Sequence, residues 1–561
     1  MSYGRVPGTN MGAHSGLNTP TGSEAYSASH HSASEEYSVD ATQLYKDYDE
    51  EDDYLHSSPY KDERYSFVQG FFHLRGFLNI ATLGLIALAL LMLFLGYPVI
   101  ANVEKIFSTK PDTNAPQRQS NVAQRGLIDP DTDPSFYKRT YAPDGSKWHL
   151  VFSDEFEQEG RTFWPGEDPY FEAVDIWYWG TGDYEWYSPE AVNTTGGALV
   201  ITLDEYEKNQ KNFRSGMVQS WNKVCFQGGY VEFSVKLPGR HDVAGYWPGL
   251  WTQGNLGRPG YGGTNEGMWP YSYDSCDTGI LPNQTYLNKT GPAKAKNAHG
   301  QYSYQYNYDL SWMPGMRFPS CTCPGEDHPG PNNNVGRSSP ELDILEANIN
   351  LAEKRGQSSQ SLQMAPFDVD YYYGNKTGVN VEIYDTEQTK QNDYTGGPIQ
   401  ESISALSLVP DKAYQLSEPS EYTTFGVQWE PDWNGDGKGA YATWIMDGKP
   451  TWTVYGNAIG PVPELDIGQR LIPREAMSLV MNVAISQSFQ QPDWDNMPFP
   501  GKMEVDYVRV YQLDGRPDRV TCDPDDYPTY DYIQRNKDIY FNPNITVFDK
   551  AKIPKNKLTG C

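Results

Sequence analysis

The segment FLNIATLGLIALALLMLFLGYPVI, from Phe77 to Ile100, contains no charged side chain. As a helix it would be about 36 Å long at ~1.5 Å per residue, which is enough to cross the hydrocarbon core of a bilayer with some tilt. A cleaved signal peptide is disfavoured, because the run is too long and begins too far from Met1. The sequence therefore predicts one transmembrane helix at 77–101, which would place the two flanking parts of the chain in different compartments.

The basic residues on the two sides of this helix are nearly balanced, so they do not determine its orientation. The orientation is inferred from residues farther along the chain. Cysteines and N-glycosylation sequons all lie on the C-terminal side, which favours an oxidising lumen there. We expect a single-pass type II protein of the endoplasmic reticulum, Golgi and plasma membrane, with one contact to the lipid bilayer. The cysteines, as disulfide candidates, are Cys225, Cys276, Cys321, Cys323, Cys522 and Cys561, and the sequons are at Asn193, Asn283, Asn288, Asn375 and Asn544.

Composition assigns the other segments. Residues 1–65 are rich in Ser, Gly, Tyr and acids, as in DYDEEDDY, and predict a disordered cytosolic tail. Residues 102–135 are polar and predict a linker. We expect one folded domain at 136–515 and a C-terminal extension at 516–561 that packs on it. The formal net charge of −29 argues against a nucleic-acid partner, because phosphate binding needs clustered Lys and Arg.

The folded domain reads as short strands separated by Gly and Pro turns. YVEFSVKL, from Tyr230 to Leu237, alternates apolar and polar residues, and EVDYVRVY at 504–511 is a further strand. WIMDGKPTW at 444–452 predicts a hairpin with Asp447 and Gly448 at the turn. Sustained helical patterns are scarce, so the fold class expected is all-β, an antiparallel β-sandwich of jelly-roll (concanavalin-like) type.

The stretch SPELDILEAN, from Ser339 to Asn348, places Glu341, Asp343 and Glu346 close together. Locally it fits a helix, with Ser339 as N-cap, Pro340 at the first position and acids in the first turn. It also fits a strand, although a regular strand would point Glu346 to the opposite face from the other two acids. One extra residue near Ile344–Leu345, a β-bulge, would bring all three to one face.

Three acids on one face suit glycoside hydrolysis with retention of configuration. That reaction needs two carboxyl groups about 5–5.5 Å apart, one as nucleophile and one as acid/base. Repulsion among the three raises at least one pKa and keeps a proton available for the leaving oxygen.

The other motifs are weaker. Asp432, Asn434 and Asp436 resemble the start of an EF-hand loop, but Thr443 stands where the loop needs Glu, so we expect a polar turn. Cys321, Cys323 and His328 could be metal ligands, although disulfide pairing is favoured in a lumenal domain. GRPGYGG at 257–263 lacks the ending of a phosphate loop. We therefore expect no metal and no cofactor.

The acid stretch resembles the E-x-D-x-x-E signature of glycoside hydrolase family sixteen, the laminarinase-like jelly rolls. The resemblance extends in order over about residues 145–515 through six further segments. These segments are WHLVFSDEF (148–156), GGYVEFSVKLPG (228–239), GYWPGLWTQG (245–254), FGVQWEPD (425–432), MNVAIS (481–486) and VDYVRVYQ (505–512).

The type II anchor, the long insertion and the CDPDDYPT tail resemble one fungal branch, the β-1,6-glucan synthesis-associated membrane proteins of the cell wall. The resemblance implies that Glu341 is the nucleophile, Glu346 the acid/base and Asp343 the residue that tunes them. Trp247 and Trp251 are candidates for stacking on sugar rings, with a core role equally open. The implied partners are β-glucan or another glucose-containing polysaccharide, and proteins of cell-wall synthesis.

The chain departs from the family pattern in two respects. An insertion at 252–340 stands where ordinary members have a short turn, and long insertions of this kind are usually functional or disordered. Ser234 stands where many members have Arg, and Thr423 or Thr424 where many have His. We expect the insertion to reshape the cleft or build an acceptor site, and the usual glucanase specificity to be altered.

Two functions follow from these features. One is a membrane-anchored retaining enzyme, a transglycosylase or glucosidase, that acts on β-glucan in fungal cell-wall β-1,6-glucan biosynthesis. The other is a non-catalytic lectin or scaffold that supports glucan assembly, and it has no need for all three acids. A wall-folding factor is a third hypothesis, and no residue specifically indicates it.

Overall fold

The structure, a computed structural model, describes residues 74–92, 122, 126–140, 145–548 and 553–561. Helix α3, Leu74–Leu91, is described by itself. Within these ranges, no helix combines the length and the apolarity needed to cross a bilayer. The span expected at 77–101 extends beyond residue 92 and is not confirmed, and the expected tail at 1–65 lies outside the described residues.

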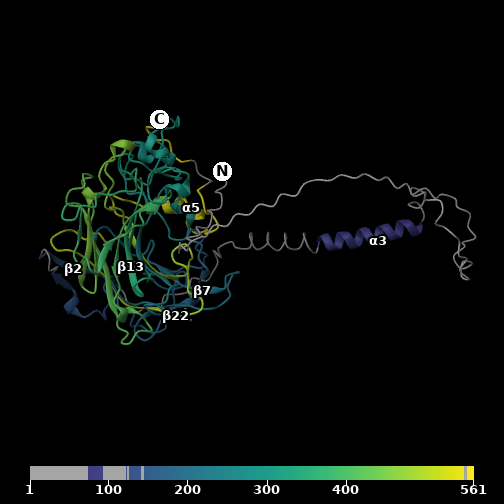
Figure 1. Ribbon diagram of the computed structural model, residues 1–561, viewed down its shortest axis with the longest axis horizontal. Helices are drawn as coiled ribbons and strands as arrows, with labels where there is room; N and C mark the ends of the chain where they lie inside the picture. The colour runs from purple at the N-terminus through teal and green to yellow at the C-terminus, as the bar shows by residue number, and fades with distance from the viewer. Residues whose placement is uncertain (1–73, 93–121, 123–125, 141–144, 549–552) are drawn as a thin grey trace, which may run out of the picture. The chain divides into compact units, whose positions relative to one another are not determined.

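Residues 114–561 contain two ten-stranded sheets (Figure 1). Neighbouring strands within each sheet pair in antiparallel fashion, so the all-β sandwich expected from the strand pattern is confirmed. Sheet A contains β1 (Lys138–Thr140), β2 (Lys147–Asp154), β5 (Val192–Thr194), β6 (Leu199–Leu203), β10 (Gly229–Lys236), β14 (Val381–Ile383), β18 (Thr423–Glu430), β19 (Tyr441–Met446), β20 (Lys449–Tyr455) and β22 (Gly501–Leu513).

Sheet B carries the acids. Its main path runs β15-β17-β13-β12-β11-β21-β8-β3, so β12 lies near the middle. Its strands are β3 (Glu172–Ala173), β8 (Met217–Gln219), β9 (Cys225–Phe226), β11 (Trp247–Gly254), β12 (Glu341–Asn350), β13 (Arg355–Met364), β15 (Thr389–Gln391), β16 (Gly396–Gly397), β17 (Gln400–Leu408) and β21 (Met477–Ala484).

The remaining elements are short. A small parallel pair joins β4 (Glu185–Tyr187) and β7 (Phe213–Ser215). The helices of the domain are α5 (Gly262–Asn265), α6 (Tyr530–Arg535) and α7 (Lys537–Tyr540). The 3-10 turns are η2 (Pro134–Phe136), η3 (Pro189–Ala191), η4 (Thr278–Ile280), η5 (Pro282–Gln284), η6 (Ala293–Lys296), η7 (Ser303–Tyr306), η8 (Asp411–Ala413), η9 (Gly456–Ile459) and η10 (Pro463–Leu465).

The main core lies between the two sheets. Leu342, Ile344 and Leu345 of β12 are fully buried in it, together with Phe233 of β10 and Val427 of β18. Because side chains alternate along a strand, burial of this face turns the opposite face of sheet B outward. That outward face is where the acids lie, and we call it the cleft face.

The predicted hairpin at 444–452 is confirmed as β19 and β20. Asp447 and Gly448 have φ of 49° and 73°, and two positive φ angles in succession match the right-handed twist of the flanking strands. At the expected polar turn, the Asp432 carboxylate accepts hydrogen bonds from the backbone of Gly435 and Gly437.

Residues 126–135, which the sequence assigned to the linker, pack against β2. The backbone of Asp129 donates to the Ser153 hydroxyl, and the Thr132 hydroxyl donates to Glu155, with both threonine and aspartate buried. Polar composition made this segment look like a linker, whereas its polar groups are hydrogen-bonded to the domain. Residues 102–121 and 123–125 of the expected linker lie outside the described range.

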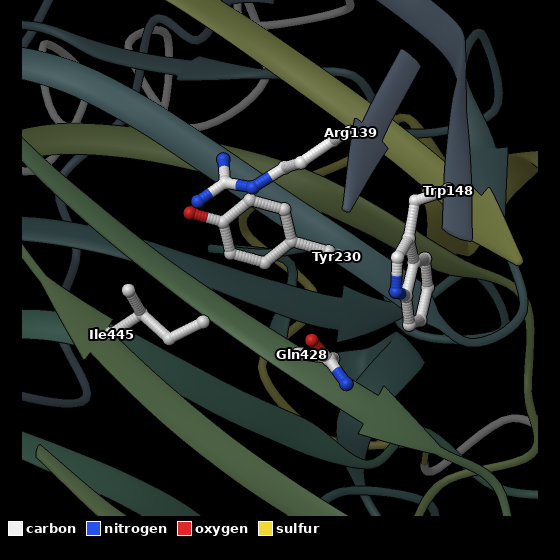
Figure 2. Close-up of a pocket in the computed structure, with 5 residues that line it drawn as sticks. All are labelled: Arg139, Trp148, Tyr230, Gln428 and Ile445. Carbon is white, nitrogen blue, oxygen red and sulfur yellow. The ribbon is translucent and has the colours of Figure 1, made fainter. Parts of the chain in front are cut away.

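The face of sheet A that points away from sheet B carries a shallow hollow (Figure 2). The guanidinium of Arg139 lies 4.5 Å from the ring centroid of Tyr230 and donates to Glu232, so the hollow is occupied by a packed ion pair. It is separated from the acids by the core and has no part in the site described next.

Candidate active site

The backbone of SPELDILEAN is extended, and β12 begins at Glu341. The alternative prediction, a helix that begins at Ser339, is therefore wrong. Ser339 donates its hydroxyl proton to the carbonyl of Gly254 instead of capping a helix, and Pro340 leads into the strand. Strand β12 pairs with β11 on one side and with β13 on the other, so its backbone groups are used in the ladder.

The expected β-bulge is present at Ile344–Leu345. Asp343 lies opposite Ser361 of β13, and Glu346 lies opposite Ser359, so two residues of β12 face the single residue Gln360. The register against β11 shifts at the same place. Because the extra residue restores the alternation, Ile344 and Leu345 both face the core and all three acids share the cleft face.

Each acid has a specific hydrogen-bond partner. The indole nitrogen of Trp269 lies 2.7 Å from a carboxylate oxygen of Glu341. The indole nitrogen of Trp247 lies 3.2 Å from a carboxylate oxygen of Glu346. The amide nitrogen of Gln363 on β13 lies 2.8 Å from a carboxylate oxygen of Asp343. These donors fix the directions in which the three carboxyl groups point.

A fourth contact holds the strand itself. The indole nitrogen of Trp444 in sheet A donates to the backbone carbonyl of Asp343 at 2.7 Å, and Trp444 is fully buried. Its ring stacks on Trp452 with centroids 4.6 Å apart. The bond spans the core between the two sheets, at the residue immediately before the bulge, so sheet A fixes the position of the acids.

Burial and mutual repulsion change the protonation of the acids. Burial raises the pKa of Glu341 well above its ordinary value, and the charges of Asp343 and Glu346 raise it further. Burial likewise raises the pKa of Glu346, with Asp343 adding to the effect. Burial raises the pKa of Asp343, against the hydrogen bonds from Gln363 and Glu341. The raised pKa values favour retention of a proton in the cluster, which acid catalysis requires.

The two tryptophans named from the sequence differ in role. Trp247 is half-buried, stacks on Phe489 with centroids 4.2 Å apart and 11° between planes, and contacts Glu346. Trp251 is 8% exposed and donates to Asn482 within a cluster of buried side chains. Trp247 contacts one of the acids, whereas Trp251 packs within the neighbouring cluster of buried side chains. Sugar stacking stays a prediction for both.

Sequence reasoning missed several residues of the site. Trp269 lies in the insertion, where no periodic pattern allowed its place to be deduced. Gln363 could have been found by pairing β12 with β13 across the turn at Leu351–Lys354, because that register puts it opposite Glu341. Tyr178 lies within electrostatic reach of the cluster: burial raises its pKa, and the charge of Glu341 is the next largest cause.

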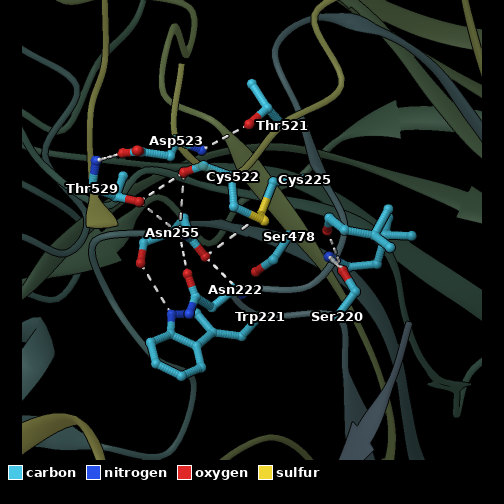
Figure 3. Close-up of a disulfide and its surroundings, with 12 residues drawn as sticks. Ser220, Trp221, Asn222, Cys225, Asn255, Ser478, Thr521, Cys522, Asp523 and Thr529 are labelled. Atoms are coloured by element: carbon cyan, nitrogen blue, oxygen red, sulfur yellow. Dashed lines mark hydrogen bonds between the residues drawn. A yellow bond between two sulfur atoms is a disulfide. The ribbon is translucent and has the colours of Figure 1, made fainter. Parts of the chain in front are cut away.

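The insertion is held to the C-terminal extension. We call residues 255–340 and 516–561 together the cap. The six cysteines form three disulfides, Cys225–Cys522, Cys276–Cys321 and Cys323–Cys561. Around the first, the amide of Asn255 donates to Cys522 and Thr529 and so joins the start of the insertion to the extension (Figure 3). A metal role for Cys321 and Cys323 is therefore excluded in this state.

Two buried arginines complete the cap. Arg337 forms a bidentate ion pair with Glu475, and both nitrogen–oxygen distances are 2.9 Å. Arg317 donates to the carbonyl of Gly263 and to the hydroxyl of Tyr532, so it bridges the insertion and the extension. Since the segment that carries Trp269 lies between Gly263 and Arg317, these contacts support the hydrogen bond to Glu341.

The sequons lie on the surface of the domain. Asn193, Asn283, Asn288 and Asn544 are exposed, and Asn375 is half-exposed. Their side chains are therefore accessible to modification, while glycosylation itself stays a prediction.

Comparison with known proteins gives both sequence and structural matches. Residues 42–561 match the profile of the family described as "Beta-glucan synthesis-associated protein SKN1/KRE6/Sbg1". The chain is 40% identical to the beta-glucan synthesis-associated protein KRE6 of Saccharomyces cerevisiae, over 93% of this chain and 70% of that protein. It is 43% identical to KRE6 of Candida albicans, over 79% of this chain and 56% of that protein.

Among solved structures, the endo-beta-1,3-glucanase from Pyrococcus furiosus is 18% identical, with a TM-score of 0.37, and covers 67% of this chain and 98% of its own. The catalytic domain of a laminarinase from Thermotoga petrophila is also 18% identical, with a TM-score of 0.36, and covers 66% and 100%. The family assignment rests on the sequence matches. The chain belongs to the SKN1/KRE6/Sbg1 family of beta-glucan synthesis-associated proteins.

Proposed function

We propose that residues 126–561 form a retaining β-glucan-active enzyme, a transglycosylase or glucosidase. The observation that carries the proposal is the bulge at Ile344–Leu345, which puts Glu341, Asp343 and Glu346 on one face with an indole donor on each outer acid. A strand that served only a structural role would gain nothing from three carboxyl groups, one buried and two half-buried, that repel one another.

The reaction has two steps. A carboxylate oxygen of Glu341 attacks the anomeric carbon, the glycosidic bond breaks, and Glu346 gives its proton to the leaving oxygen. A glycosyl ester on Glu341 results. Glu346, now a carboxylate, takes a proton from an acceptor hydroxyl, whose oxygen attacks the anomeric carbon and releases Glu341. Water as acceptor gives hydrolysis, and a sugar hydroxyl gives transfer.

The neighbouring residues divide the two roles. The indole of Trp269 stabilises the carboxylate form of Glu341, which the nucleophile needs. Asp343 contributes negative charge beside both glutamates: it raises the pKa of Glu346, as the acid needs, and that of Glu341, which the indole of Trp269 opposes. One strand thus supplies two carboxyl groups with opposite requirements, separated by the residue that tunes both.

The cellular setting is part of the same proposal. Phe77–Ile100 anchors the chain in a type II orientation, with the sandwich in the lumen of the secretory pathway or outside the plasma membrane. The uncharged run, the sequons and the disulfides support this arrangement. The names of the relatives, which associate them with β-glucan synthesis, support a role in making wall β-1,6-glucan alongside other wall-synthesis proteins, and favour transfer over hydrolysis.

The test uses full-length protein in detergent with defined β-1,3- and β-1,6-gluco-oligosaccharides. Products are followed by mass spectrometry for the parent, Glu341→Gln and Glu346→Gln. Glu353→Gln is the matched control, because Glu353 is exposed in the turn that follows β12. We expect new or shortened oligosaccharides from the parent and the control, and a loss of at least a hundredfold in both active-site variants.

Two further results separate the alternatives. Oligosaccharide binding without product from any of the proteins would favour the lectin reading. A 2-deoxy-2-fluoro glycosyl fluoride of the preferred donor should leave its sugar on the peptide that contains Glu341. An adduct on a different carboxyl group would reassign the nucleophile.

A further inference from the structure

The insertion reaches the connection between β16 and β17 of sheet B with a group of aromatic side chains. The backbone nitrogen of Trp312 donates to the carbonyl of Pro398 at 2.7 Å. The ring of Tyr306 meets the ring of Trp312 edge-on, with centroids 5.4 Å apart, and the rings of Tyr302 and Tyr394 have centroids 5.9 Å apart. We call Tyr302, Tyr306, Trp312 and Tyr394 the aromatic arm.

The arm is accessible. Trp312 is 39% exposed and Tyr394 is 41% exposed, while Tyr302 and Tyr306 are half-buried beneath and beside them. Large aromatic rings left open in this way, in a segment held by backbone hydrogen bonds, are typical of a surface that binds another molecule.

The register of sheet B connects the arm to the acids. The loop that carries Tyr394 pairs with β17, where the backbone of Asn392 donates to Ser404. Ser404 lies opposite Ser361 of β13, and Ser361 lies opposite Asp343 of β12. Residues directly opposite each other point to the same face of a sheet, so these side chains form a row on the cleft face from the arm to the acids.

Two polar atoms on this floor have no hydrogen-bond partner among the described residues. They are the hydroxyl oxygen of Ser404, which is 1% exposed, and the amide oxygen of Gln363, which is 7% exposed. A buried polar atom left unpaired costs free energy, but both atoms are sealed from solvent here, so they belong to the packed layer beneath the cleft surface. Both lie between the aromatic arm and the acids.

The arm lies within electrostatic reach of Glu346. Burial raises the pKa of Tyr394, and the charges of Tyr306 and Glu346 raise it further. The residue is nonetheless well exposed, so its ring is accessible to a ligand. Glu346 faces the leaving group in the first step and the acceptor in the second, so a surface near Glu346 suits an acceptor.

We propose that the aromatic arm binds the acceptor, a β-linked glucan chain, along the row that leads to the acids. Glucose rings present apolar C–H faces that stack on the exposed rings of Trp312 and Tyr394. A neutral polymer suits a chain whose net charge is −29, which would repel an anionic one. The assignment rests on the proposed function, because it takes Glu346 as the acid/base.

The experiment measures acceptor dependence with full-length protein in detergent. The donor concentration is fixed, a β-gluco-oligosaccharide acceptor is varied, and transfer and hydrolysis products are quantified together. We expect Trp312→Ala and Tyr394→Ala to raise the acceptor concentration for half-maximal transfer about three- to tenfold, as the loss of one stacking contact predicts. Hydrolysis of the donor without acceptor should stay within about twofold of the parent.

Controls separate stacking from folding. Tyr394→Phe keeps the ring and should stay close to the parent, and Tyr530→Ala removes an exposed ring on α6, away from the arm. Equal loss of hydrolysis and transfer in the two alanine variants would overturn the proposal, and so would an unchanged acceptor dependence.

If the parent forms no product at all, the result counts against the proposed function. The aromatic arm can still be tested. Binding of the same oligosaccharide to parent and variants by titration calorimetry then tests the arm alone. Weaker binding by Trp312→Ala but not by Tyr530→Ala supports it. Equal binding by all the proteins overturns it, and binding of a protein segment or an N-glycan in preference to glucan would do the same.

Discussion

The indole of Trp269 donates to Glu341 at 2.7 Å across a sequence separation of 72 residues, which places a residue of the insertion in direct contact with the proposed nucleophile. The insertion is therefore part of the site itself. The reactivity of Glu341 depends on a segment whose position is fixed by disulfides and by the C-terminal extension.

Trp269→Phe keeps the ring and removes the donor. A hydrogen bond to a carboxylate stabilises its charged form, so its loss raises the pKa of Glu341. The nucleophile must be deprotonated, and we therefore expect the acidic limb of the activity–pH profile to move about one unit towards higher pH. Trp433→Phe, in the turn after β18, should leave the profile unchanged. An equal loss of rate at every pH would contradict this prediction.

Trp247→Phe should act on the opposite limb. Trp247 donates to Glu346 and lowers its pKa, so the variant holds the acid/base protonated to higher pH. The basic limb should move upward, by less than one unit because the bond at 3.2 Å is longer than that of Trp269. The pH profile of transfer measures it. Movement of the acidic limb instead would mean that the roles of the two glutamates are reversed.

Glu341→Gln should stabilise the fold at alkaline pH. The folded state raises the pKa of Glu341 above its unfolded value of about 4.3, so the folded state binds more protons. The stability that this proton provides is present below pH ~4.3 and is lost as pH rises through the raised pKa. Glutamine removes that loss. We expect the Tm of the variant to exceed that of the parent by ~2 °C at pH 8, with a smaller difference at pH 5.

Calorimetry at the two pH values tests this, with Glu353→Gln as the exposed control. A larger gain at pH 5 than at pH 8 would contradict the sign of the pKa shift. The same comparison with Asp343→Asn should give a gain of the same sign, because burial raises the pKa of Asp343 as well.

Replacing both Cys323 and Cys561 by Ser frees one end of the cap. Loss of a native disulfide typically costs about 2–4 kcal/mol. We expect faster proteolysis within residues 276–340 and an acidic limb shifted in the same direction as in Trp269→Phe, because the indole is held less firmly. Faster proteolysis with an unchanged pH profile would show that the disulfide does not position Trp269.

The sequence contained enough to place the acids. The spacing of Glu341, Asp343 and Glu346 cannot put all three on one face of a regular strand, and the bulge that reconciles them is present. The alternating strands and the Asp447–Gly448 hairpin were equally readable, since local patterns determine them.

The rest depends on contacts between distant residues. The cap is built from short turns, as at Thr278–Ile280 and Ser303–Tyr306, so periodicity places none of its side chains. Cys225 and Cys522 are separated by 297 residues, and their pairing cannot be read from spacing. Residues 126–135 were misread because their polar groups are hydrogen-bonded to the domain, as Thr132 is to Glu155, and because Ile128 packs against a cluster that includes Trp148 and Leu150 of β2.

The disulfide between Cys323 and Cys561 can form only late in the synthesis of the chain. It can form only after the ribosome has synthesised the chain as far as residue 561, when the two sheets have already emerged. The sandwich can thus assemble with its three carboxyl groups in place while the cap is still open. Oxidation of the two thiols then completes the bond, so the finished site is a late product of biosynthesis.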